Sequence, residues 1–503
     1  MTARAGSKTP GDSKKPEKSK EGERKERRKQ RWRRIAIGAG LSLLLAGLGV
    51  GAGWHFSHSA PAAKPGPPCT SCLSIEPVNA ALRSVMQAID NENAAVLTDT
   101  ARPWVSVALL NPFTLGPDSD VTAQRMVDQL RGAYLGQLEM NVPAATIGVR
   151  LILINEGTSA EQNEEKAVLQ LESMEKSDHI VAVAGMGLSN AATAAAATAL
   201  SRDGMPMFAA VPTADQFTGQ AYPGLVQVTP DVTAQINLLA ATLKHLGAAI
   251  LVYDKTTTDY YTSDVRKDFE TDFGSHLTGI EHPYTPGLPD TSEDFRLIAQ
   301  QVCYQQGPSP VILYAGRQIV LGQLIQQLQG VTNSCAGKQI YIVTAGDADG
   351  LDPQSTAAPS SEGQVSVIYT DIFDAHKLSG TFEKLYGSNL TALADPHGTG
   401  LTDPWMATSY NTMMAASTAI NAGYGATSPN PPGKRDVLYW VDQLNNSFKS
   451  SRTNSPLAPI GATGPFSLDN NGKLLNPGIP IYEDTAGNRI PLSSAAAASL
   501  SLP

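Results

Sequence analysis

Residues 180–201 read IVAVAGMGLSNAATAAAATALS, which is an apolar run, a glycine-containing turn and an alanine-rich stretch in direct succession. A short apolar run that ends in glycine is typical of a buried strand, and the alanine-rich stretch is typical of a helix. A strand that passes through a short turn into a helix is the repeating unit of parallel α/β sheets. This stretch therefore predicts an α/β fold with its functional loops after the strands.

The same unit recurs on both sides of this stretch. We predict strands at 105–110, 147–155, 180–185, 207–210, 248–253, 279–284, 310–316 and 339–346. We predict helices at 122–140, 161–176, 190–201, 232–246, 263–273, 292–304 and 318–329, and residues 75–97 also show helical spacing. Alternation of this kind requires crossover helices between buried parallel strands. Two successive runs predict two lobes, each with a doubly wound parallel sheet.

The N-terminal segment differs sharply from the rest of the chain. Residues 1–34 carry fourteen Lys and Arg and five Asp and Glu, and we expect them to form a disordered cytoplasmic tail. Residues 35–54, IAIGAGLSLLLAGLGVGAGW, are long enough for one transmembrane helix across a ~30 Å hydrocarbon core. The basic flank places the C-terminal bulk outside the cell membrane, because positive flanks stay inside. A cleaved signal peptide is the alternative interpretation of the apolar run.

The remainder of the chain is acidic and lacks catalytic motifs. Residues 35–503 carry 24 basic and 42 acidic side chains, whereas nucleic-acid binding requires a basic surface. The basic tail is also compatible with a nucleic-acid-binding arm, but its position before the apolar run favours a topology signal. The sequence contains no zinc-protease motif, P-loop or nucleophile elbow, and its eight His show no metal-ligand spacing. We therefore expect a binding protein without cofactor or metal, and not an enzyme.

The four cysteines are compatible with an oxidising compartment. Cys69 and Cys72 form a CTSC motif in the Pro-rich segment after the apolar run, and a local disulfide is the simpler interpretation because no second ligand pair follows. Cys303 and Cys335 each end a predicted helix just before a strand. Adjacent crossover helices bring such ends close together, so we predict a disulfide between Cys303 and Cys335.

Residues just after the predicted strands are the candidate binding groups, because parallel sheets bind ligands beyond the carboxyl ends of their strands. Ser189 precedes a helix and is a ligand-binding hydroxyl, a plain helix cap, or both. Thr213 either caps a turn or contacts a ligand. Tyr260 and Tyr261 are paired aromatics, of which one is expected to pack in the core. Arg317 and Asp347 each follow a strand and are either ligand contacts or solvated charges.

Six segments in order resemble the type I periplasmic-binding-protein superfamily, specifically its branched-chain amino-acid-binding branch. They are GMGLSNAAT (185–193), MPMFAAVPTADQFT (205–218), ILVYDKTTTDYYTSDVRKDFE (250–270), VILYAGRQIVLGQLIQQLQ (311–329), SYNTMMAASTAI (409–420) and GATGPFSLDNNGK (461–473). The resemblance covers about residues 101–490. It implies a two-lobed domain whose lobes are joined by a hinge of three crossover strands.

The resemblance also implies a site. Ser189 and Thr213 would bind the carboxylate and ammonium of an amino-acid-like ligand, assisted by backbone groups of Leu188 and Val211, and Tyr261 would close over it. Asp347 is the candidate acidic partner of the ammonium. Arg317 departs from the family pattern, which often has an aromatic at its position, so an acidic ligand is conceivable.

The resemblance implies the following boundaries. Residues 55–100 would form an extracytoplasmic stalk and linker, and residues 101–503 the ligand-binding domain. Lobe one would comprise about 101–230 and 369–455, and lobe two about 231–362 with the C-terminal strands. We predict a membrane-anchored solute-binding protein that captures a small amino-acid-like ligand between its lobes for an ABC-type importer. The alternatives are a sensory ectodomain that signals through a partner, and a cell-surface scaffold that binds no small ligand.

Overall fold

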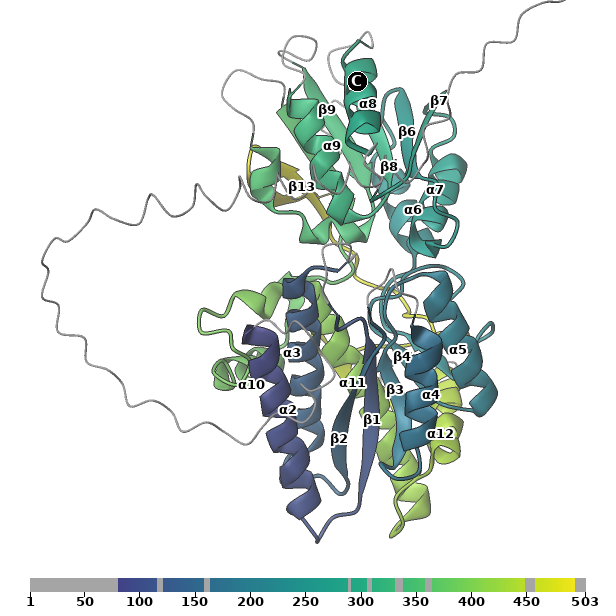
Figure 1. Ribbon diagram of the computed structural model, residues 1–503, viewed down its shortest axis with the longest axis vertical. Helices are drawn as coiled ribbons and strands as arrows, with labels where there is room; N and C mark the ends of the chain where they lie inside the picture. The colour runs from purple at the N-terminus through teal and green to yellow at the C-terminus, as the bar shows by residue number, and fades with distance from the viewer. Residues whose placement is uncertain are drawn as a thin grey trace, which may run out of the picture. The chain divides into compact units, whose positions relative to one another are not determined.

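The structure is a computed structural model that describes residues 80–114, 121–157, 163–287, 291–304, 310–330, 338–357, 364–447 and 457–493. The chain divides into two compact units, residues 1–66 and 67–503, and every described residue belongs to the second unit. Within that unit, two β-sheets build two α/β lobes (Figure 1). The two-lobed α/β architecture predicted from the alternating sequence pattern is confirmed.

The sheet of lobe one is entirely parallel, with the strand order β2-β1-β3-β4-β5. Its strands are β1 (Trp104–Asn111), β2 (Gly148–Asn155), β3 (Ile180–Gly185), β4 (Met207–Ala209) and β5 (Leu225–Gln227). Successive side chains of a strand point to opposite faces, so Val107 and Leu109 enter one hydrophobic cluster and Ala108 and Leu110 enter another. Burial of both faces explains why the strands appear in the sequence as continuous apolar runs.

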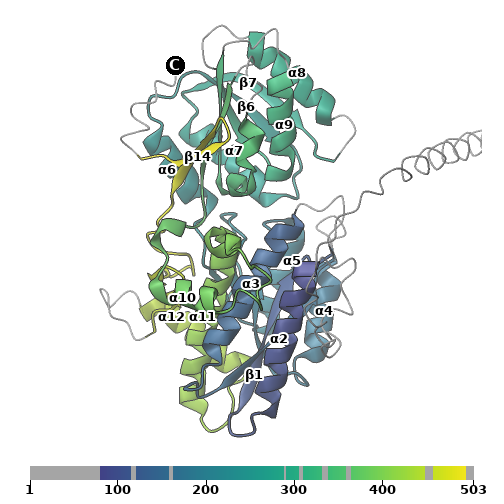
Figure 2. The same cartoon turned by 90° about the vertical axis from the view of Figure 1, so that its left-hand side faces the viewer.

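Helices cover both faces of this sheet, as Figures 1 and 2 show. They are α2 (Ala80–Thr98), α3 (Ala123–Met140), α4 (Glu164–Met174), α5 (Ala191–Asp203), α10 (Gly380–Ser388), α11 (Pro404–Thr427) and α12 (Lys434–Ser447). α4 and α5 pack on one face, and α2, α3, α11 and α12 pack on the other. α3 and α11 approach closely because Gly132 and Gly136 lack side chains at the crossing; a Cβ at Gly132 would collide with the carbonyl oxygen of Met406.

The folded domain begins before residue 101, which corrects the predicted boundary between linker and domain. α2 lies within residues 55–100, yet Leu82, Val85 and Ile89 are fully buried in the main cluster of lobe one. The side chain of Asn93 also donates to the carbonyl of Leu151 on β2 at 2.9 Å. The helix therefore belongs to lobe one, because its apolar stripe has no other surface on which to be buried.

Lobe two contains a mixed sheet with the strand order β14-β13-β10-β9-β8-β6-β7. Its strands are β6 (Ala249–Asp254), β7 (Leu277–Tyr284), β8 (Val311–Ala315), β9 (Gln339–Thr344), β10 (Gln364–Thr370), β13 (Ile481–Thr485) and β14 (Asn488–Pro491). Only β13 and β14 run antiparallel to their neighbours in this sheet. α8 (Thr291–Tyr304) and α9 (Gln318–Gly330) cover one face, and α6 (Val232–Thr242) and α7 (Tyr260–Asp272) cover the other.

Three crossovers connect the two sheets, between β5 and α6, after β10, and before β13. They are tied to one another by backbone hydrogen bonds, from Gln227 to Gly472 at 2.8 Å and from Asp371 to Pro480 at 3.0 Å. β10 extends to Thr370 in the sheet of lobe two, so lobe one resumes slightly later than the predicted residue 369. A small hairpin of β11 (Ile460–Gly461) and β12 (Gly464–Pro465) precedes the last crossover.

Several predictions concern residues outside the described ranges. These include the basic tail (1–34), the apolar run (35–54), Cys69, Cys72 and Cys335. In the part of the chain that the structure describes, no helix is both long and apolar enough to cross a bilayer. Cys303 lies in α8, is 3% exposed and is disulfide-bonded, but its predicted partner Cys335 is outside the described residues. The pairing therefore stays a prediction.

Candidate functional site

The candidate site lies between the lobes, where the loops after the strands of both sheets meet. A cavity of about 20 Å³ is lined there by residues of both lobes: Val211, Thr213, Ile372 and Trp405 with Tyr261, Arg317, Gly346 and Asp347. The sequence had singled out Val211, Thr213, Tyr261, Arg317 and Asp347, and the structure brings these five together. Such a volume holds about one water molecule.

The Ser189 hydroxyl is used within lobe one. Its Oγ accepts hydrogen bonds from the backbone N–H groups of Thr213, at 2.8 Å, and of Ala214, at 3.0 Å. The cap of α5 is instead Asn190, whose side chain accepts from the N–H of Thr193. Ser189 therefore ties the loop after β3 to the loop after β4, and the alternative interpretation of Ser189 as a helix cap is wrong.

Two further lobe-one candidates, Leu188 and Thr213, differ in how their side chains are placed. The side chain of Leu188 is 4% exposed and belongs to the hydrophobic cluster on the α3 side of the sheet. Thr213 is 5% exposed and lines the cavity, and its hydroxyl forms no hydrogen bond with a described residue. Thr213 is therefore a polar group of lobe one that remains available at the cavity.

Tyr261 lies in the first turn of α7 and is 2% exposed. Its hydroxyl oxygen accepts a hydrogen bond from the backbone N–H of Asp347 at 3.1 Å. Burial raises the pKa of the Tyr261 phenol well above its ordinary value, and the nearby Asp347 carboxylate raises it further. The ring stays neutral at physiological pH and forms one wall of the cavity.

Arg317 occupies the centre of the acidic side of the site. Its guanidinium donates to both carboxylate oxygens of Asp259, at 2.7 and 3.0 Å, and its Nη1 lies 3.7 Å from Oδ1 of Asp347. The guanidinium also lies 4.6 Å from the centroid of the Tyr261 ring. Burial opposes its charge, but Asp259 and then Asp347 outweigh burial and raise the Arg317 pKa. Bidentate pairs of this kind are the strongest ionic contacts in proteins.

The lobes touch directly beside the cavity. The carbonyl oxygen of Ser189 accepts from the N–H groups of Tyr260, at 3.0 Å, and Tyr261, at 3.2 Å. The backbone N–H of Asp215 in lobe one donates to the Asp264 carboxylate in lobe two at 2.8 Å. These three hydrogen bonds hold the loops of the two lobes in a closed arrangement around the cavity.

A second ionic cluster joins the lobes near the hinge. Arg125 on α3 forms a bidentate pair with Asp349 of lobe two, and it lies 3.5 Å from Asp403 at the start of α11. Asp371, at the second crossover, is 6% exposed. Burial raises the Asp371 pKa to about 7, and Arg125 only partly counteracts this effect. The carboxyl groups of Asp349, Asp371 and Asp403 therefore share the Arg125 guanidinium, and Arg489 also acts on Asp371.

Sequence reasoning missed Asp259, Arg125, Asp349 and Trp405. Asp259 carries a local signal, because it precedes the helix YYTSDVRKDFETD and its side chain accepts from the N–H of Thr262, as a capping residue does. Arg125 and Asp349 carry no local sequence signal, because their pairing joins residues 224 positions apart. Only the fold brings them together.

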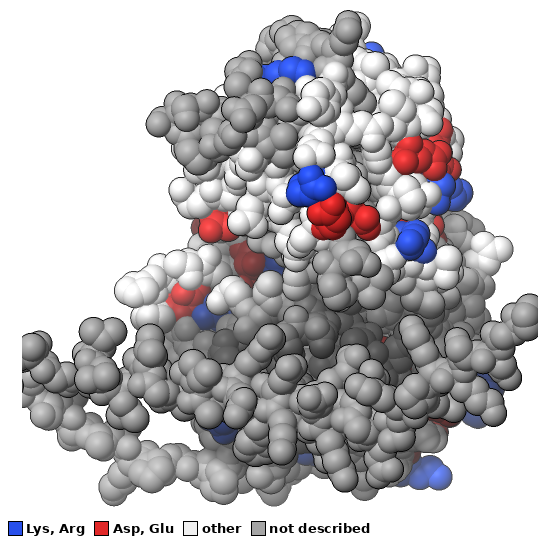
Figure 3. Space-filling view, turned by 45° about the horizontal axis from the view of Figure 1, so that its top comes forward, with Lys and Arg blue, Asp and Glu red and all other residues white. Residues whose placement is uncertain are grey.

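Charged side chains of the described residues bear on two other kinds of site. On the face in Figure 3, the coloured basic side chains lie apart or beside acidic ones and form no continuous basic patch. Among the described residues, no group of three or more His, Cys, Asp or Glu is placed to hold a metal ion. The cleft is lined by hydroxyl, carboxylate, guanidinium and aromatic groups.

Comparisons with known proteins identify the fold. No family model and no curated protein matches the sequence. The solved leucine-binding protein LivK from Thermotoga maritima superposes with a TM-score of 0.57 at 16% identity, covering 77% of this chain and 98% of that one. A branched-chain amino-acid transporter substrate-binding protein, LivJ, from Streptococcus pneumoniae, bound to isoleucine, gives 0.55 at 15%, covering 76% and 97%.

A third similar structure was solved with a ligand that is not an amino acid. A solute-binding protein of an ABC transporter from Rhodopseudomonas palustris, in complex with 3,4-dihydroxybenzoic acid, has a TM-score of 0.53 at 14% identity, covering 76% of this chain and 92% of that one. At such identities the likeness establishes the fold and leaves the ligand open. The chain thus has the two-lobed fold of type I solute-binding proteins.

Proposed function

We propose that the protein is an extracytoplasmic solute-binding protein that captures a small amino-acid-like ligand between its lobes and delivers it to an ABC permease. The observation that supports the proposal best is the composition of the interlobe cavity. Thr213 from lobe one faces Tyr261, Arg317 and Asp347 from lobe two across that cavity. Polar groups that converge from two lobes at the carboxyl ends of parallel strands are typical of ligand sites in this architecture.

Ligand entry requires the lobes to open, because the cavity of about 20 Å³ is far smaller than the roughly 300–1,000 Å³ of small-molecule sites. Opening breaks the contacts from Tyr260 and Tyr261 to Ser189 and separates Arg125 from Asp349. The Arg317, Asp259 and Asp347 group carries one positive and two negative charges, so it favours a ligand with an ammonium group over a purely anionic one. Asp347 is the acceptor that we assign to this ammonium.

The basic tail and the apolar run support membrane anchoring as part of the proposal. Residues 35–54 would form a single transmembrane helix with the N-terminus in the cytoplasm. Protease applied to intact cells should then remove the binding domain and spare a tag placed before residue 1. Loss of the N-terminal tag under these conditions would reverse the assigned topology.

Calorimetric titration tests the ligand site. The protein is titrated with leucine, isoleucine and other amino acids, and with the matching carboxylic acids that lack the amino group. We expect binding of one or more amino acids, no binding of the deaminated acids, and weakening by about ten- to a hundredfold in Thr213→Val and Asp347→Asn, because each loses a hydrogen bond to a charged ligand group. Thr198→Val is the control, since Thr198 lies on the exposed side of α5. Unchanged affinity in both cleft variants would refute the site.

One specific observation favours a second candidate, a cell-surface scaffold that binds no small ligand in the cleft. Arg317 already fills the position between Asp259, Asp347 and Tyr261, and the Ser189 hydroxyl is already engaged by two backbone N–H groups. When the polar groups of the cleft already bond to one another, a ligand adds less favourable binding free energy. Absence of any calorimetric signal across the amino-acid panel, together with an unchanged melting temperature, would support the scaffold and refute the solute-binding proposal.

A further inference from the structure

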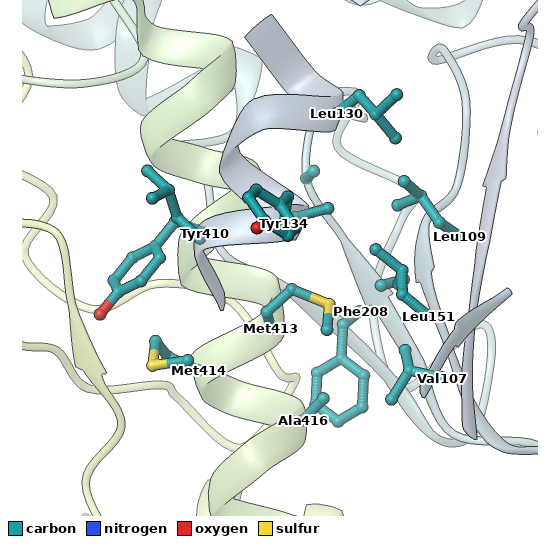
Figure 4. Packing of buried hydrophobic residues seen from close by; sticks show 14 of the residues in the cluster. Val107, Leu109, Leu130, Tyr134, Leu151, Phe208, Tyr410, Met413, Met414 and Ala416 are labelled. Atoms are coloured by element: carbon teal, nitrogen blue, oxygen red, sulfur yellow. The ribbon is translucent and has the colours of Figure 1, made fainter. Parts of the chain in front are cut away.

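A second cavity, of about 700 Å³, lies in lobe one outside the cleft. It is bounded by the end of α3, by α10, by α11 and by the segment around β11. Figure 4 shows that Tyr410 and Met414, which line it, leave α11 on the side away from the sheet residues Val107 and Leu109. Its volume falls within the roughly 300–1,000 Å³ of small-molecule sites, unlike that of the interlobe cavity. We call it the α10–α11 pocket.

Two polar groups, the Tyr410 hydroxyl and the Glu139 carboxylate, lie at the pocket and could orient a ligand. The Tyr410 hydroxyl forms no hydrogen bond with a described residue although the side chain is 4% exposed. The half-buried Glu139, near the end of α3, also lines the pocket and forms no ion pair or side-chain hydrogen bond with a described residue. Burial, and then the charge of Glu139, raise the Tyr410 pKa, so the phenol keeps its proton. An unpartnered carboxylate beside an unpartnered phenol is an attractive site for a hydrogen-bond donor.

The pocket lining has an acidic side chain but no basic side chains. Among the lining residues Glu139 is the only acidic side chain, and there is no Lys, Arg or His to receive an anion. The other polar lining groups are neutral, among them Thr381, Ser417 and Asn421. A carboxylate ligand would face Glu139 without compensation, whereas a cation would be attracted. The lining therefore selects for amines and against acids.

The opposite part of the lining is apolar. The Phe382 ring lies 4.8 Å from the Tyr410 ring, centroid to centroid, and Met414 follows Tyr410 by one helical turn. Ile460, at the edge of the pocket, is 64% exposed in spite of its apolar side chain. A ligand with an apolar body would cover Ile460 and contact Phe382 and Met414, which removes apolar surface from water.

We propose that the α10–α11 pocket binds a small amphipathic amine, with its ammonium between Glu139 and Tyr410 and its apolar body against Phe382 and Met414. The proposal does not depend on ligand binding in the cleft, because no residue lines both cavities. It assigns lobe one a second binding site of different chemistry from the cleft.

The test uses 2-phenylethylamine as the probe, titrated into the full chain by calorimetry. Phenylacetate is the matched control ligand, because it has the same aromatic body and the opposite charge. We expect the amine to bind with a dissociation constant in the micromolar to millimolar range and phenylacetate not to bind. Glu139→Gln should weaken amine binding at least tenfold, and Tyr410→Phe by a few fold, because the ring contact with Phe382 is kept.

Three further variants determine whether the amine binds in the α10–α11 pocket or elsewhere on the protein. Glu383→Gln removes the same charge from an exposed position on α10 that does not line the pocket, and it should leave amine binding unchanged. Asp347→Asn distinguishes the two cavities, because Asp347 lines the cleft and not the α10–α11 pocket. A loss of amine binding in this variant would place the amine in the cleft and overturn the proposal. Ser417→Phe should fill the pocket and abolish binding while the circular dichroism spectrum stays the same.

Two other results of these experiments would overturn the proposal: a lack of selection for positive charge, and self-association of the chain. Equal binding of phenylacetate and 2-phenylethylamine, or an unchanged affinity in Glu139→Gln, would overturn the proposed charge selection. If no amine binds and the chain instead self-associates in sedimentation experiments, with Ile460→Lys restoring the monomer, the exposed apolar edge belongs to a contact between copies and the proposal is wrong.

Discussion

Arg317 and Asp259 form a bidentate ion pair, with contacts of 2.7 and 3.0 Å, at the cavity between the two lobes. The same guanidinium lies over Tyr261 and near Asp347. An acidic residue and an aromatic ring are the groups that recognise cations in general. The protein's own arginine therefore satisfies the acidic side of the cleft in the closed arrangement.

Replacement of Arg317 by alanine should leave Asp259 and Asp347 without their shared cation. We expect the free energy of unfolding to fall by roughly 3–5 kcal/mol, because one partner of a buried pair is removed. Millimolar ethylguanidinium should then raise the melting temperature of the variant more than that of the wild type, by filling the vacated position.

Arg266→Ala is the matched control for this experiment. Arg266 also pairs with an acid and lies over a tyrosine ring, but its side chain is 35% exposed. Such a pair contributes only about 0–1 kcal/mol. If ethylguanidinium affects the wild type and Arg317→Ala equally, the guanidinium position is not a binding site for cations.

Ser189 and Thr213 should respond differently to removal of their hydroxyls. Ser189→Ala leaves the N–H groups of Thr213 and Ala214 without their acceptor, so we expect the unfolding free energy to fall by about 1–3 kcal/mol. Thr213→Val removes a hydroxyl that has no described partner, and stability should change by less than about 1 kcal/mol. Urea denaturation measures both values. Equal losses in the two variants would contradict the hydrogen-bonding pattern around the loop after β3.

Asp371 should make stability depend on pH. Burial raises its pKa in the folded protein from 3.8 to about 7, and the charged groups that act on it include Arg125, Asp403, Arg489 and Asp349. The folded state therefore holds a proton that the unfolded state has lost. The stabilisation is fully present below pH 3.8 and is lost as the pH rises through about 7.

Asp371→Asn removes this titration while its side-chain oxygen still accepts from the N–H of Phe373. Between the two pKa values the variant's stability should decline less steeply with rising pH, by up to ~1.4 kcal/mol per pH unit. The variant should therefore gain stability relative to the wild type as the pH increases. Guanidinium denaturation at a series of pH values checks this result, and parallel curves for the two proteins would show that Asp371 does not titrate in this range.

The predicted bridge from Cys303 to Cys335 is open to a direct test. Cys303 is buried at the end of α8 and is disulfide-bonded. A bridge to Cys335 would enclose a loop of about thirty residues and stabilise the fold by ~3–4 kcal/mol in the chain-entropy model. Mass spectrometry of non-reduced peptides should find the two cysteines linked, and reduction should lower the melting temperature. Recovery of Cys303 linked to a different cysteine would show that the pairing is wrong.

The sequence by itself determined most strands and helices between residues 105 and 346, and the order of the loops that join them. It did not reveal β5, β10, β13, β14, α10 or α12. Apolar runs such as IVAVAG at 180–185 are strands because both faces of a parallel sheet are buried, and the amphipathic stretches between them are the crossover helices. Since ligand loops follow the strands in this architecture, Thr213, Tyr261, Arg317 and Asp347 could be singled out from their positions alone. Local pattern was sufficient for these residues because strand ends converge on one edge of each sheet.

Only the tertiary structure decided what these residues do. The pairing of Arg317 with Asp259, the use of Ser189 as an acceptor between two loops, and the bond between Arg125 and Asp349 all depend on contacts distant in sequence. The α10–α11 pocket likewise combines Glu139 with Tyr410 and Ile460, which no local pattern connects. Hydrogen bonds and ion pairs act over a few ångströms, so their partners are fixed by how the elements pack and not by the periodicity that forms each element.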